Sequence, residues 1–182
     1  MHSREPSARV VAMSGEPAIL VAYATKHGST REVADAIGAA LLEHGLLVDV
    51  LSAQDVHSLE PYAGVVLGGA LYMGRWHRDA REFLKRHEKA LESIPLAVFG
   101  MGPKTLDDAD VAGARAQLDA ALAKTPTLTP DDIAVFGGVI DPAKLRFPLS
   151  RLPASDARDW DAIHEFTERA ASLMHNAEVA RV

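Results

Sequence analysis

The stretch Ala18-Ile-Leu-Val-Ala-Tyr-Ala-Thr-Lys-His-Gly-Ser-Thr30 decides the fold of this chain. Its first six residues, 18–23, form an unbroken apolar run, which is typical of a strand buried on both faces of a parallel sheet. The polar remainder carries hydroxyl side chains and Gly28, and apolar residues then recur at helical spacing at Val33, Ile37, Ala40 and Leu41. Gly45 is a typical helix stop. This part of the chain therefore predicts a strand, a polar loop and a helix.

The same alternation continues along the chain. Further strands are expected at residues 46–50, 63–69, 95–100 and 133–138. Three more helical faces are expected, formed by Ala80, Phe83, Leu84, His87 and Leu91, by Val111, Ala114, Leu118, Ala121 and Leu122, and by Trp160, Ile163, Thr167, Ala170 and Met174, with Ser155 as the N-cap of the last helix. The pattern predicts an α/β fold, a doubly wound five-stranded parallel sheet of order 2-1-3-4-5 with helices on both faces. A ligand crevice is then expected at the carboxyl ends of the strands.

Length and composition limit the function classes. The 182 residues suit one domain, expected over residues 18–176, with tails at 1–17 and 177–182 and with Met13 as an alternative start. The absence of cysteine excludes disulfides, thiolate zinc sites and a cysteine nucleophile, and it fits a cytoplasmic protein. A net charge of -6 argues against a nucleic-acid partner, and no apolar run is long enough to span a bilayer.

The loop after the first strand has the chemistry of a phosphate site. A helix start offers unpaired N–H groups and a partial positive charge, and Thr25, Ser29 and Thr30 add hydroxyl donors. The spacing matches neither the GxxxxGK[ST] nucleotide loop nor the GxGxxG dinucleotide loop. The alternative is a helix cap supplied by Ser29 or Thr30, with no ligand at all.

Residues 25–30, Thr-Lys-His-Gly-Ser-Thr, resemble the T-x-x-G-[NS]-T phosphate loop of the flavodoxins. Residues 69–77, Gly-Ala-Leu-Tyr-Met-Gly-Arg-Trp-His, and residues 83–87, Phe-Leu-Lys-Arg-His, resemble the branch of that superfamily that contains the menaquinone-dependent protoporphyrinogen dehydrogenases. Phe136-Gly-Gly-Val139 and Asp159-Trp160 are similar to it too. The connection at 141–154 is shorter than the insertion which that branch carries there. The resemblance implies FMN, rather than FAD, as the cofactor.

The resemblance also implies where FMN is held. The phosphate would lie on residues 25–30, and the ring between the loops after the third and fourth strands. The implied contacts are Thr25, Lys26, His27, Gly28, Ser29, Thr30, Gly69, Ala70, Leu71, Tyr72, Met73, Gly74, Trp76, Gly100, Met101 and Gly102. Four of the neighbouring features have alternatives without a ligand: Tyr72 as a surface ring, Trp76 as a packing residue for the second helix, His77 as a helix N-terminal residue, and Asp107 to Asp110 as an acidic helix turn rather than a metal site.

Cationic residues gather near the expected crevice although the chain is acidic overall. Residues 72–89 hold six Lys and Arg against three acidic residues. We expect Arg75, His77 and Arg78 at the rim, where cations would attract an anionic substrate or partner. The favoured function is an oxidoreductase that passes electrons to or from a small acceptor such as a quinone or a porphyrinogen. The alternatives are an electron carrier between redox proteins and a regulatory module that binds another phosphate. Neither a metal nor membrane association beyond peripheral contact is expected.

Overall fold

The computed structural model describes residues 16–179, without the side chain of Leu149. Five parallel strands lie side by side in the order β2-β1-β3-β5-β6, so the predicted fold and strand order are confirmed. They are β1 (Ala18–Ala24), β2 (Val48–Ser52), β3 (Tyr62–Tyr72), β5 (Leu96–Met101) and β6 (Asp132–Phe136). All seven residues of β1 are buried, as the unbroken apolar run predicts.

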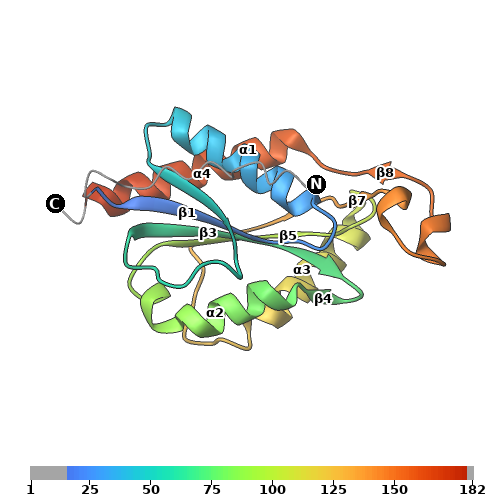
Figure 1. Cartoon of the computed structure of the whole chain (residues 1–182), viewed down its shortest axis with the longest axis horizontal. Coiled ribbons are helices and arrows are strands. Elements are labelled where there is room, and N and C mark those ends of the chain that lie inside the picture. The colour runs from blue at the N-terminus through green and yellow to red at the C-terminus, as the bar shows by residue number, and fades with distance from the viewer. Residues whose placement is uncertain (1–15, 180–182) are drawn as a thin grey trace, which may run out of the picture.

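Helices cover both faces of the sheet (Figure 1). They are α1 (Ser29–Glu43), α2 (Arg78–Leu91), α3 (Asp108–Leu122) and α4 (Trp160–Val179). Helices α1 and α4 lie together on one face, and α2 and α3 lie on the other (Figure 1). The two faces bury separate hydrophobic clusters, one around Phe99 and Phe166 and the other around Phe83 and Leu118. The sheet is therefore the middle layer of three, and its carboxyl edge is left open for a site.

The periodicity of α2 predicts its packing residue by residue. Its five buried side chains are the five expected ones, Ala80, Phe83, Leu84, His87 and Leu91. Except for Ala90, polar residues take the remaining positions, as expected of a helix that packs one stripe against a sheet. Helix α1 ends as predicted too, since Gly45 has a φ of +83°, in the left-handed region that glycine adopts at a helix end.

The start of α4 differs from the prediction. Its first turn is capped by Asp159, whose Oδ1 accepts hydrogen bonds from the backbone N–H groups of Asp161 and Ala162, both at 3.1 Å. Ser155 lies four residues earlier, in a short strand, and so is not the cap. Trp160 is 47% exposed rather than part of the buried face, because it occupies the first helical position, beyond the edge of the sheet.

Several short elements lie at the carboxyl edge of the sheet. Strand β4 (Arg75–Trp76) turns back antiparallel to the end of β3. The connection from β6 to α4 contains β7 (Val139–Ile140), the 3-10 turns η1 (Pro142–Lys144) and η2 (Leu149–Arg151), and β8 (Ser155–Asp156). Strands β7 and β8 pair antiparallel at the base of this connection. Helix α4 continues to Val179, three residues beyond the expected domain end, and residues 1–15 of the expected N-terminal tail lie outside the described residues.

Candidate functional site: a cleft at the carboxyl edge of the sheet

The loop between β1 and α1 turns into the helix at a glycine with a positive φ. Gly28 has a φ of +96° and occupies the N-cap position of α1, with no side chain capping the helix. Its N–H donates to Thr25 Oγ1 at 2.9 Å, and its carbonyl accepts from Glu32 N at 3.1 Å to begin the helix. The alternative in which Ser29 or Thr30 caps α1 is therefore wrong. The first turn of α1 keeps its N–H groups for another acceptor.

Two polar atoms of this loop are buried without a partner. Thr30 has no exposed surface, and its Oγ1 makes no hydrogen bond. His27 is half-buried, and its Nε2 atom is also buried without a hydrogen-bond partner. A buried polar atom without a partner costs about 1–3 kcal/mol, so each of these two atoms is a candidate for contact with water or with a ligand. Burial, and then the charges of Lys26 and Lys144, lower the pKa of His27 below its usual value. The loop therefore offers donors to an anion.

A cleft of about 790 Å³ opens beside this loop. Its walls come from the loops after β1, β3, β5 and β6, which is where the topology predicts a crevice. Most of the expected residues line it, namely Thr25, Lys26, His27, Ser29, Ala70, Leu71, Tyr72, Met73, Gly74, Trp76, Met101 and Gly102, as do the rim residues Arg75, His77 and Arg78. Gly28, Thr30, Gly69 and Gly100 are not among the lining residues.

Gly69 and Gly100 make room for protein side chains instead of for a ligand. A Cβ atom on Gly69 would lie 2.5 Å from Nε1 of Trp76, which donates to the Gly69 carbonyl at 3.0 Å. A Cβ atom on Gly100 would lie 3.0 Å from Cδ1 of Leu71. Trp76 is only 1% exposed and also lies close to Ala80 of α2. Trp76 therefore packs α2 against β3, as its alternative interpretation expects, while part of it reaches the cleft.

The β3–β4 turn brings a tyrosine to the cleft mouth. The turn residues Met73 and Gly74 have φ values of +48° and +76°. The ring of Tyr72 is 38% exposed, and Nζ of Lys26 lies 4.9 Å from its centroid, so the phosphate-type loop and the turn meet across the cleft. His77 caps α2, with its Nδ1 accepting from Asp79 N at 3.2 Å, as its alternative interpretation expects.

The two rim arginines differ in their partners. Nε of Arg78 lies 2.6 Å from Oε1 of Glu82, one helical turn along α2, and this contact raises the pKa of the guanidinium. Arg75 is exposed and makes no ion pair with any residue that the structure describes. The acidic segment from Asp107 to Asp110 begins α3. Asp107 caps this helix, and its Oδ1 accepts a hydrogen bond from Asp110 N at 2.9 Å, as expected of an acidic helix turn.

A fourth wall of the cleft comes from residues that the sequence analysis did not name as cofactor contacts. Val139, Ile140, Leu145 and Leu152 line it, and all four come from the connection between β6 and α4. These four apolar residues are spread over fourteen positions without a helical or strand period, so periodicity does not predict that they share a wall. The only sequence signal for a cleft wall is that Leu145 and Leu152 stand among cationic residues. The connection is anchored by Arg158, which pairs with Glu32 and with Asp156, both at 2.6 Å.

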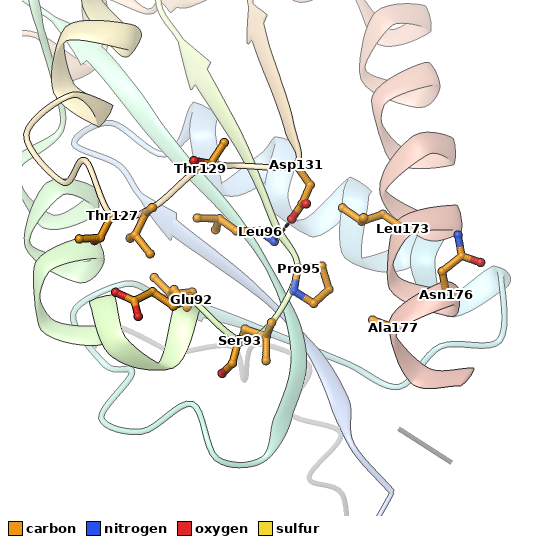
Figure 2. A pocket seen from close by; sticks show the side chains of 13 residues that line it. Glu92, Ser93, Pro95, Leu96, Thr127, Thr129, Asp131, Leu173, Asn176 and Ala177 are labelled. Atoms are coloured by element: carbon orange, nitrogen blue, oxygen red, sulfur yellow. Dashed lines mark hydrogen bonds between the residues drawn. The ribbon is translucent and has the colours of Figure 1, made fainter. Parts of the chain in front are cut away.

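A second hollow, of about 530 Å³, lies at the opposite edge of the sheet, near the start of β5 (Figure 2). Figure 2 shows the carboxylate of Asp131 directed at the backbone of Leu96, whose N–H it accepts at 2.9 Å. Glu92 lines the hollow as well, and no Lys, Arg or His is found among its described lining residues. This hollow is thus unsuited to a phosphate, and the cleft is the better candidate site.

A family model described as a flavodoxin domain matches residues 20–149, which include the polar loop, the β3–β4 turn and most of the cleft. The chain belongs to the flavodoxin family. Flavodoxins bind FMN, so the cofactor expected from the sequence is the one that the family carries. The chain is also 32% identical over 84 residues to the protoporphyrinogen IX dehydrogenase [quinone] of Escherichia coli strain K12. That match covers 45% of this chain and 46% of the relative, less than half of either.

Solved structures support the same fold. A flavodoxin from the domain Archaea is 14% identical, with a TM-score of 0.56, and the match covers 88% of this chain and 98% of the archaeal one. The flavodiiron core Flv1 from Synechocystis sp. PCC6803 is 16% identical, with a TM-score of 0.59, over 92% of this chain and 37% of that protein. The match therefore spans nearly the whole of the archaeal flavodoxin and 37% of the flavodiiron core. No helix among residues 16–179 is long and apolar enough to cross a bilayer.

Proposed function

We propose that this protein is an FMN-dependent oxidoreductase that exchanges electrons with small molecules, such as a quinone that accepts them or a porphyrinogen that donates them. The observation that carries the proposal is the buried, unpartnered hydroxyl of Thr30 at the start of α1, directly after Ser29, which lines an apolar-walled cleft of about 790 Å³. The hydroxyl and the first N–H groups of α1 fit a phosphate, and the cleft fits a flat ring. The residues present therefore fit FMN.

Each wall of the cleft has a part in holding the cofactor. Thr25, Ser29 and Thr30 would bind the phosphate together with the N-terminus of α1, whose partial positive charge favours an anion. Leu71, Met101 and the apolar residues of the β6–α4 connection would cover the ring and exclude water from it. When bound, FMN would supply the reversible acceptance of electrons, while these residues hold it in the cleft.

Support for a small acceptor comes from the rim and from the relative. Lys26, Arg75 and Lys104 line the cleft, so its mouth is cationic on a chain of net charge -6. Such a mouth favours an anionic molecule. The E. coli relative is named for protoporphyrinogen and for a quinone, and the segment that it matches is a part of each chain.

A second candidate is an electron carrier that docks redox proteins. One observation favours it: the structural match with the archaeal flavodoxin covers 98% of that protein and 88% of this chain. A carrier would keep FMN in the same cleft and would have no small substrate of its own.

The experiment that separates these functions begins with purified protein loaded with FMN. The reduced protein is mixed with a water-soluble quinone, and the oxidised protein is mixed separately with protoporphyrinogen and the same quinone, both under exclusion of oxygen. Multiple turnovers of protoporphyrinogen to protoporphyrin, with reduction of the quinone, support the oxidoreductase. Stable FMN binding with no turnover of either, together with electron transfer to a redox protein, supports the carrier. A protein that binds no flavin contradicts both and leaves the regulatory module.

A further inference from the structure

The connection between β6 and α4 forms an ordered projection at the open end of the molecule. Strands β7 and β8 close its base, and local backbone hydrogen bonds such as Ser150 N to Arg146 O, at 3.2 Å, shape its outer part. Figure 1 shows this segment, in orange, projecting from the same end as the turn between β3 and β4. Both projections border the mouth of the cleft, since residues of each line it.

The side chains of this projection divide between the cleft and the solvent. Leu145 and Leu152 line the cleft. Phe147 is 72% exposed and does not line it, and the guanidinium of Arg151 lies 5.0 Å from the centroid of its ring. Residues 142–153 contain Lys144, Arg146 and Arg151 and no Asp or Glu. An exposed ring among cations is therefore the outer surface of this segment.

The β3–β4 turn repeats this combination on the other side of the mouth. Met73 is 83% exposed at the tip of the turn, and the exposed Arg75 follows it directly after Gly74. Exposed apolar side chains at two projections, each beside cations, are typical of protein surfaces that insert shallowly into a lipid interface.

We propose that the open end of the molecule binds the surface of an anionic lipid bilayer, with Phe147 and Met73 entering the interface and Arg75, Arg146 and Arg151 contacting the headgroups. Charge complementarity favours this occupant, because these cations stand out on a chain of net charge -6. Two narrow apolar projections suit a soft surface better than the flat, closely packed surface of a protein partner. The inference does not depend on which molecule exchanges electrons at the cleft.

In this orientation the mouth of the cleft faces the bilayer. Residues of both projections border the mouth, so a compound dissolved in the lipid reaches the cleft without crossing bulk water. Binding to an anionic bilayer would also explain why residues 142–153 combine cations and apolar residues without any Asp or Glu.

The test is sedimentation of the FMN-loaded protein with vesicles of phosphatidylcholine alone or with about one third phosphatidylglycerol. The wild-type protein is expected to sediment with the anionic vesicles and to be released by salt, because surface potentials are screened within about 10 Å at 0.1 M. The double variant R146Q/R151Q is expected to bind roughly twenty- to thirty-fold more weakly, about fivefold for each cation lost. F147S is expected to bind more weakly without losing the salt dependence.

The matched control is K89Q/K124Q, which removes two exposed cations near the opposite edge of the sheet. It carries the same charge change and is expected to bind the vesicles like the wild type. A tryptophan at position 147, in F147W, is expected to lose fluorescence with vesicles that contain brominated lipid. Absence of wild-type binding to anionic vesicles, or equal losses in the two double variants, would overturn the proposal. Binding to polyglutamate but not to vesicles would overturn it too, since it would assign the surface to an acidic protein.

Discussion

At the scale of single residues, the buried hydroxyl of Thr30 is the group that a bound phosphate would supply with a hydrogen-bond partner. Its side chain is fully buried and gains no hydrogen bond from the protein. We expect T30A to weaken FMN binding by roughly ten- to a hundred-fold, because a hydrogen bond to a charged group contributes about 1.5–3 kcal/mol. The free energy of unfolding without FMN should change little, because removal of an unsatisfied hydroxyl offsets the loss of a buried methyl group. T30S keeps the hydroxyl and should bind FMN nearly as the wild type does, which fluorescence titration can measure.

The two rim arginines give a second residue-scale prediction. Arg75 is unpaired among the described residues, whereas Arg78 and Glu82 form a pair of no net charge. R75Q should therefore slow reoxidation of the bound flavin by an anionic quinone and flatten its dependence on salt. The control variant R78Q/E82Q removes the neutral pair and should leave the salt dependence as in the wild type. Equal salt responses with anionic and neutral quinones would show that the rim does not steer the acceptor.

At the scale of elements, the β3–β4 turn contains a residue in an unfavourable conformation. Met73 has a φ of +48°, which costs a residue other than glycine, asparagine or aspartate roughly 1 kcal/mol. We expect M73N to raise the free energy of unfolding by about 0.5–1 kcal/mol, measured by urea titration. G74A is the opposite control, since Gly74 has a φ of +76°, and it should lower the stability. A destabilising M73N would indicate that the Met73 side chain contributes packing that its exposure conceals.

Helix α2 carries a buried histidine that makes stability depend on pH. His87 is 7% exposed, and its ring lies 4.7 Å from that of Phe83. Burial lowers the pKa of His87 below its usual value of about 6.5, with the charge of Arg86 acting the same way. As the pH falls below about 6.5, the unfolded chain therefore binds more protons than the folded one. The free energy of unfolding decreases as a result. H87Q should lose less stability than the wild type between pH 7.5 and 5.5 in urea unfolding. An unchanged pH slope would contradict this account.

At the scale of the whole molecule, local patterns predict the layers of the fold well. The apolar run at 18–23 and the five-residue stripe of α2 are both buried as expected. Expectations failed where a contact from elsewhere in the fold decides the outcome. Gly69 is covered by Trp76 and Gly100 by Leu71, and no local pattern reveals either contact. The β6–α4 connection closes the cleft through Leu145 and Leu152, whose roles depend on how β7 and β8 pair.

The central claim is that the start of α1 holds the phosphate of FMN. Its most direct test is a titration of the flavin-free protein with FMN and with riboflavin, which lacks the phosphate. The account predicts that FMN binds at one molecule per chain, and more than about a hundred-fold more tightly than riboflavin, since several charge-assisted hydrogen bonds are lost together. It also predicts that T30A weakens binding of FMN but not of riboflavin. Equal affinities for the two flavins, or no binding of either, would contradict the claim.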